Sequence, residues 1–145
     1  MSTKVLSSEE HFKFSEASEA ATTFSKLFYD TYDKRRQALE KLYLTDATLI
    51  WDGNKVNGAA NICKYLAELP SSSGTQVECV DCHPIADKLT EGQTSMIVNV
   101  MGLIRYSTAK PKSTPFTQTF LMTTQTSAAG TVAWKIVKDS FRTIQ

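Results

Sequence analysis

Two cysteines and a histidine stand together in the middle of the chain, in the run Cys79-Val80-Asp81-Cys82-His83. Their C-x-x-C-H spacing is the attachment pattern of c-type haem, and a C-x-x-C pair is also typical of thiol redox sites. Haem attachment needs both thiols on one side of a helical turn. The segment 75–85 is instead predicted to be a β-strand, in which residues three apart point to opposite faces.

A zinc ion would find three ligands here, Cys79, Cys82 and His83, but no obvious fourth, because His11 belongs to another element. Cys63 makes the number of cysteines odd, and the polar N-terminus shows no export segment, so we expect no disulfide framework. We interpret the thiols as small apolar side chains of a half-buried strand. The sequence therefore predicts no haem, no metal ion and no other cofactor.

Several acidic groups and one histidine have the chemistry for proton transfer or dehydration, which would need a pocket that raises their pKa. These candidates are Asp46, Asp52, Asp81, His83, Asp87 and Asp139. No Ser/His/Asp order, glycine-rich phosphate loop or metal-ligand cluster accompanies them. We interpret each as a turn residue or a solvated edge and expect no catalytic residue. A small isomerase or dehydratase that uses Asp81 or His83, which share strand parity, is the enzymatic alternative.

The composition is that of one ordinary globular domain. The chain has 145 residues, 41% of them apolar, and 16 Lys and Arg against 15 Asp and Glu leave a net charge of +1. This balance argues against direct nucleic-acid binding and against a highly charged disordered protein. No run of 18 apolar residues predicts a membrane span. We expect a single domain over 1–145, with 1–7 as a flexible N-terminus, in a reducing compartment.

Three helices are expected in the first half. Ser7 and Glu10 form a capping box, and apolar residues recur with a 3.6-residue period over 8–33, which predicts one long amphipathic helix. A shorter helix is expected over 33–43, where we interpret Lys34-Arg35-Arg36 as a solvated face because acidic residues flank it. A third helix is expected over 58–69, stopped by a proline and a serine-rich stretch.

The remaining segments are predicted to be β-strands. A short strand over 47–51 leads through Asp52-Gly53, a strong hairpin signal, into a return strand over 55–57. Longer strands are expected at 75–85, 93–106, 116–126 and 131–143. Helices first and strands last predict an α+β domain in which a bent antiparallel sheet wraps over the helices.

The late strands carry apolar residues on both faces. In the strand from residue 93, Met96 and Val98 alternate with Ile97 and Met101. One face covers the helices, and the other would be an apolar surface too large for a soluble monomer. The sequence thus predicts a partner surface. The rival explanation is a sheet that curls enough to bury both faces.

Several short runs of the sequence form a characteristic series in their order and spacing. The runs are Tyr32-Asp33-Lys34-Arg35-Arg36, Leu42-Tyr43, Ala47-Thr48-Leu49-Ile50-Trp51-Asp52-Gly53-Asn54, Val80-Asp81-Cys82-His83-Pro84, Val132-Ala133-Trp134-Lys135-Ile136 and Phe141-Arg142. Together they resemble the nuclear transport factor 2-related export proteins, the small subunits of the heterodimeric nuclear mRNA export receptor. The resemblance covers about residues 20–142.

The resemblance implies a nuclear transport factor 2-like cone, with three helices packed on a strongly bent antiparallel sheet, and a non-enzymatic function. In that family the small subunit packs its sheet against a matching domain of the large receptor subunit. This stabilises the domain for binding phenylalanine-glycine nucleoporins and for mRNA export through the nuclear pore. It implies a protein that shuttles between nucleus and cytoplasm and contacts neither RNA nor membrane directly.

One residue carries over from the family. The arginine of the terminal Phe-Arg pair forms an ion pair with an acidic residue of the large subunit, and it maps to Arg142. Strand alternation adds a set of sheet-face candidates, without showing which face is outward. These are Phe116, Gln118, Phe120, Met122 and Trp134.

A related branch of the family implies the main non-enzymatic alternative, a homodimer that carries the GDP form of the GTPase Ran. That branch uses acidic residues near the mouth of the cone. Here the loop over 107–115 holds Lys110 and Lys112 and no acid, although Asp52 keeps one carboxylate nearby. We therefore disfavour Ran carriage.

Overall fold

The computed structural model of the protein describes residues 8–85, 94–108 and 110–144, with side chains from residue 15 onward. The expected flexible stretch over 1–7 lies outside these residues. No helix in the described part is long and apolar enough to cross a membrane. The elements, in chain order, are α1 (Ser8–Lys34), the 3-10 helix η1 (Arg36–Leu42), β1 (Tyr43–Trp51), β2 (Asn54–Asn57), α2 (Ala59–Glu68), β3 (Gln76–Ile85), β4 (Ser95–Arg105), β5 (Ser113–Thr126) and β6 (Val132–Thr143).

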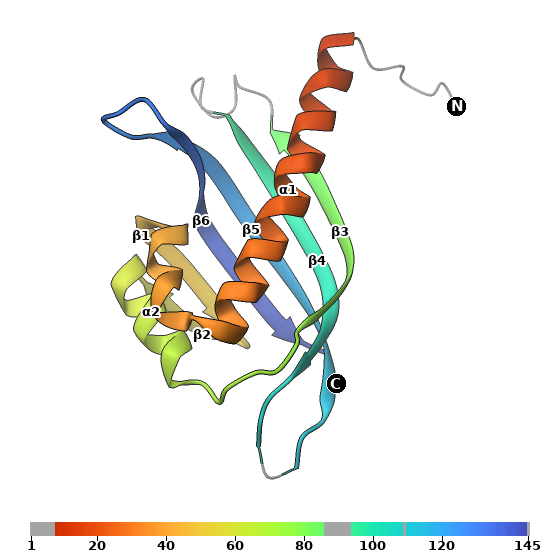
Figure 1. The fold of residues 1–145 in the computed structure, drawn as a ribbon, viewed down its shortest axis with the longest axis vertical. Helices are drawn as coiled ribbons and strands as arrows, with labels where there is room; N and C mark the ends of the chain where they lie inside the picture. The colour runs from red at the N-terminus through yellow and green to blue at the C-terminus, as the bar shows by residue number, and fades with distance from the viewer. Residues whose placement is uncertain (1–7, 86–93, 109, 145) are drawn as a thin grey trace.

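Six strands form one curved sheet in the order β2-β1-β6-β5-β4-β3, and the helices lie on its concave face (Figure 1). Helix α1 crosses the β3 and β4 side, while α2 and η1 pack beside β1. The predicted α+β class and cone are confirmed. The sheet is mixed rather than wholly antiparallel, because β1 runs parallel to β6 while the other neighbours are antiparallel.

Helix α1 places an apolar stripe on the sheet. Ala17, Ala21, Phe24 and Phe28 are all buried, at the three- and four-residue spacing that puts them on one helix face. Both phenylalanine rings meet Phe120 of β5, with centroids 5.4 and 4.9 Å apart. Burial of each such ring contributes about 2–3 kcal/mol, so this seam anchors the helix.

Arg36 joins the end of α1 to the end of α2. Its guanidinium lies 4.2 Å from the centroid of the Tyr32 ring. Its hydrogen bonds run to the carbonyl oxygens of Tyr32 (2.9 Å), Leu66 (3.0 Å), Leu69 (2.8 Å) and Pro70 (2.7 Å) and to Ser72 Oγ (3.2 Å). The expected solvated face is therefore wrong for Arg36, although Lys34 and Arg35 are exposed. The arginine supplies donors that helix-end carbonyls otherwise lack.

An aromatic column fills the inside of the sheet's curve. Trp51 stacks on Phe141 with centroids 3.7 Å apart, and Phe141 stacks on Phe116 at 5.2 Å. Tyr32 of α1 lies over Trp51 at 5.8 Å. The space in which enzymes of cone-shaped folds would need a pocket is here occupied by the chain's own rings.

Glycine is required where β3 departs from regular pairing. The register between β3 and β4 shifts between Val77 and Cys79. A Cβ atom on Gly102 would stand 2.2 Å from the carbonyl oxygen of Gln76 and 3.1 Å from the Phe116 ring. The bulge therefore brings the β3 backbone into space that only glycine leaves open.

Candidate protein-interaction surface

The convex face of the sheet is covered by no described helix (Figure 1). Because side chains alternate along a strand, every second residue of β1, β4, β5 and β6 points toward it. Met101 is 51% exposed, while Ile50, Ile97 and Leu121 are half-buried. We call this surface the open face. It is the second strand face that the sequence analysis expected the helices to leave uncovered, and its role as a partner surface stays a prediction.

The strand register arranges the open face in rows. Ser140 of β6 lies between Ile50 of β1 and Thr119 of β5. Lys138 lies in the next row, between Thr48 and Leu121. Small and polar side chains thus alternate with aliphatic ones across the middle of the sheet. Thr119 also donates a 2.8 Å hydrogen bond to Asn99 Oδ1 on β4.

Cations on β4 and β6 give the open face a positive charge over β4, β5 and β6. Arg105, Lys138 and Arg142 are exposed cations on these strands, and their alternation with buried neighbours places them on the open side. The one carboxylate of these strands, Asp139, is 0% exposed and points into the core. The centre of the open face therefore favours an acidic counterpart.

Four of the predicted partner-binding residues lie on the opposite side of the sheet. Phe116, Gln118, Phe120 and Met122 are each at most 1% exposed and pack on the concave face. In the folded chain they cannot reach a partner, so their assignment to an interface is wrong. All four side chains point to the same face of β5, and the helices pack on that face.

Trp134 also belongs to the concave side. It is half-buried against the core and lines a small hollow with Glu16 and Ala17 of α1. The register of β6 against β5 shifts between Leu121 and Met122, and this bulge keeps Trp134 on the helix side. Arg142 is the one predicted contact residue that is exposed on the open face, opposite Thr117. Its role as an interface residue stays a prediction.

The cysteines and His83 do not converge. Cys79, Asp81 and His83 are exposed on β3, an edge strand, whereas Cys82 is buried with its thiol 3.4 Å from the Ser18 hydroxyl. Within the described ranges, no three His, Cys, Asp or Glu side chains are grouped to hold a metal ion. Asp81 and His83 face away from the cone interior. They therefore do not line a pocket inside the cone, as the isomerase or dehydratase alternative would require.

The remaining candidate acids have structural surroundings. Asp46 is exposed, and Asp52 follows the last residue of β1 and accepts hydrogen bonds from the backbone N–H and hydroxyl of Thr143 at 2.8 and 3.1 Å. Asp87 lies outside the described residues. Lys110 and Lys112, the cations of the late loop, are exposed.

The candidate acids were expected to lie in turns or at solvated edges, and Asp139 is the exception because it is buried in the core. Its carboxylate accepts hydrogen bonds from the Tyr43 hydroxyl at 2.6 Å and from Gln118 Nε2 at 2.7 Å. Burial raises the pKa of Asp139 to about 7, although these two bonds act in the opposite direction. The same carboxylate and above all burial raise the pKa of Tyr29 and of Tyr43. The group is sealed from solvent, which suits a structural carboxylate rather than a catalytic one.

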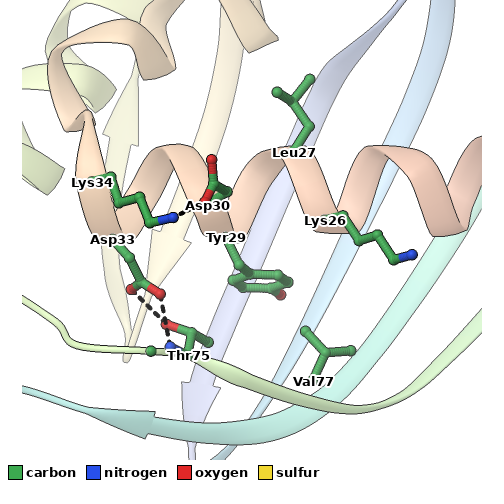
Figure 2. Close-up of a pocket in the computed structure, with 9 residues that line it drawn as sticks. Lys26, Leu27, Tyr29, Asp30, Asp33, Lys34, Thr75 and Val77 are labelled. Carbon is green, nitrogen blue, oxygen red and sulfur yellow. Dashed lines mark hydrogen bonds and ion pairs between the residues drawn. The ribbon is translucent and has the colours of Figure 1, made fainter.

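A groove of about 630 Å³ lies between α1 and the start of β3, as Figure 2 shows. Its acids are engaged: Asp33 accepts from Thr75 N at 2.7 Å and Thr75 Oγ1 at 2.8 Å, and Asp30 pairs with Lys34 at 2.9 Å. The Tyr29 hydroxyl points past the groove to Gln118, at 2.7 Å. The lining therefore holds the edge strand to the helix and offers no free base or nucleophile.

The family profile of the Nuclear transport factor 2 (NTF2) domain matches residues 20–143. The chain belongs to the nuclear transport factor 2 family. It is 40% identical to NTF2-related export protein 1 of Bos taurus over 127 residues, covering 88% of each chain. It is 42% identical to NTF2-related export protein 2 of Homo sapiens, covering 88% of this chain and 87% of the relative. The solved nuclear transport factor 2 of Cryptosporidium parvum superposes with a TM-score of 0.71 at 26% identity, over 89% of this chain and 95% of that one.

Membership of the nuclear transport factor 2 family confirms the resemblance drawn from the short sequence runs. The named relatives are transport and export proteins, not enzymes. The structure adds open-face residues that the sequence analysis did not single out, namely Ile50, Thr119, Leu121, Lys138 and Ser140. Their signal was present in the alternation of Thr and Ser with larger residues, which is typical of a solvent-side strand face.

Proposed function

We propose that the protein is the non-enzymatic small subunit of an mRNA export receptor. Its open face packs on the nuclear transport factor 2-like domain of a large subunit. The observation that carries this proposal is a whole sheet face, with Ile97, Met101 and Leu121 on it, that the chain's own helices leave uncovered. Faces of this kind on small domains are buried in complexes.

The small subunit acts by supporting its partner. Packing two sheets together buries an apolar centre and fixes the large subunit's domain in a form that binds phenylalanine-glycine nucleoporins. The complex then carries mRNA through the nuclear pore, shuttling between nucleus and cytoplasm. The small subunit itself contacts neither RNA nor membrane, and the names of its relatives as export proteins support this role.

Co-purification with the large subunit's nuclear transport factor 2-like domain tests the proposal. Both proteins from the same organism are mixed and analysed by size-exclusion chromatography with light scattering. We expect a one-to-one complex. Ran loaded with GDP serves as the competing ligand. Binding of Ran by a homodimer, with no binding of the large-subunit domain, would overturn the proposal.

A further inference from the structure

The open face has a hollow of about 340 Å³ at its centre, between neighbouring rows of side chains. It is lined by Ile50 of β1, Thr119 and Leu121 of β5, and Lys138 and Ser140 of β6. Ser140 pairs with Ile50 on one side and with Thr119 on the other, so a small side chain forms the floor between larger walls. A depression of this shape accommodates a protruding side chain of another surface.

The charge around the hollow is positive, and Lys138 is the charged residue of its lining. Lys138 and Arg142 stand two positions before and after Ser140 on β6, a spacing of about 7 Å along a strand on either side. Within the described residues, no carboxylate forms an ion pair with either cation. The hollow therefore combines aliphatic walls with the positive charge of Lys138, and Arg142 stands beyond it on the same strand.

The charge pattern also distinguishes between possible occupants. A second copy docked through β4, β5 and β6 would set Arg105, Lys138 and Arg142 against the same three cations. Their facing carboxylate is missing on these strands, because Asp139 is buried on the other side. Like charges brought together at an interface oppose association, so β4, β5 and β6 disfavour pairing with the same strands of a second copy. Asp81 of β3 lies on the same face at its edge, in the row of Asn99 and Thr119.

We propose that this hollow receives a bulky apolar side chain of a different, acidic protein surface, on which a carboxylate beside that side chain pairs with Lys138. The inference rests on the proposed function and specifies what the large subunit's sheet must present. Aliphatic walls exclude water from the seated side chain, and the charged rim sets its orientation. Lys138 and Ser140 thereby become determinants of partner choice.

Isothermal titration calorimetry with the large subunit's purified domain measures the effect of filling the hollow. Ser140→Phe occupies the floor and is expected to weaken binding about tenfold or more, whereas Ser140→Ala keeps the hollow open and binds within about threefold of the wild type. Leu121→Ala removes a wall and weakens binding without adding bulk. Thermal unfolding of each variant checks that it is folded.

The charged rim has its own variant pair. Lys138→Glu is expected to weaken binding about tenfold or more, and more so at low salt, while Lys64→Glu on the exposed side of α2 leaves binding unchanged. Wild-type affinity in both folded Ser140→Phe and Leu121→Ala would overturn the hollow's role and leave the proposed function standing. No binding by the wild type, or its self-association through this face, would overturn both.

Discussion

The hydroxyl of Tyr43 donates a 2.6 Å hydrogen bond to the buried carboxylate of Asp139, joining the first residue of β1 to the middle of β6. Gln118 donates to the other carboxylate oxygen at 2.7 Å and accepts from the Tyr29 hydroxyl at 2.7 Å. One polar chain thus links α1, β1, β5 and β6 inside an apolar core. Buried networks of this kind fix the relative placement of elements when every member is satisfied.

Asp139 makes the stability of the protein depend on pH. Its pKa of about 7 in the folded chain lies above the ordinary carboxyl value of 3.8. The folded state therefore holds an extra proton between these values. The stabilisation that comes from this bound proton is fully present below about pH 4 and is lost as the pH rises through 7. It amounts to a free energy of unfolding on the order of 4 kcal/mol in total.

Asp139→Asn removes this titration. Urea unfolding of the parent protein and of the variant is measured at pH 5 and at pH 8. The change in unfolding free energy between the two pH values is compared between the two proteins, which separates the effect of Asp139 from that of the other carboxylates. We expect the parent to lose more stability than the variant over this interval. An equal loss in both would show that Asp139 does not change its protonation there.

Arg142→Glu should disrupt the complex with the large subunit while leaving the chain folded. The side chain is exposed on the open face, so its charge reversal costs little in the isolated chain. If its partner is a desolvated carboxylate, like charges would then meet, at a cost of about 2–5 kcal/mol in binding. Calorimetry measures this loss, with Lys64→Glu as the matched control. Undiminished binding would remove Arg142 from the interface.

Arg36→Lys should lower the free energy of unfolding by about 2–3 kcal/mol, although the charge is kept. An ammonium group has three donors without the planar fork, so it cannot reach the carbonyls of α1 and α2 together. Chemical denaturation measures the change, and Arg35→Lys at the exposed neighbour should stay within about 0.5 kcal/mol. Equal stability of the two variants would contradict the joining role of Arg36.

Gly102→Ala should destabilise the fold by about 2–4 kcal/mol, because the new methyl group meets the Gln76 carbonyl at 2.2 Å. Gly130, at a φ of +85° with open space around it, is the control. Gly130→Asn should cost less than about 1 kcal/mol, since asparagine tolerates that conformation. Thermal unfolding compares the two. Similar losses would mean that the bulge adapts.

The sequence was sufficient for the order of the elements and for most of their boundaries, because periodicity and turn residues are local signals. The long helix ends at Lys34, against an expected end at residue 33, and the last strand begins at Val132, against 131. The second helix was expected as an α-helix but forms as a 3-10 helix over Arg36–Leu42. Apolar spacing over so short a segment does not distinguish an α-helix from a 3-10 helix.

The orientation of the sheet faces was beyond the sequence. The sequence analysis places Arg142 on one surface with the alternate β5 residues Phe116, Gln118, Phe120 and Met122. In the sheet, however, Thr117 pairs with Arg142, and Gln118 pairs with Phe141. Arg142 therefore lies on the face opposite to Gln118. Register between strands and the β6 bulge settle this, and neither follows from alternation within a single strand.

Strand β6 is the last strand in chain order, yet it lies between β1 and β5 in the sheet. During synthesis, the β1–β2 hairpin has no neighbour in the sheet until residues 132–143 have left the ribosome. Pairing of β1 with β6 joins residues about 90 positions apart, and such non-local pairing is slow. An unpaired β1 edge therefore persists until β6 is available, and a truncation before residue 132 would remove the sheet's centre rather than its margin.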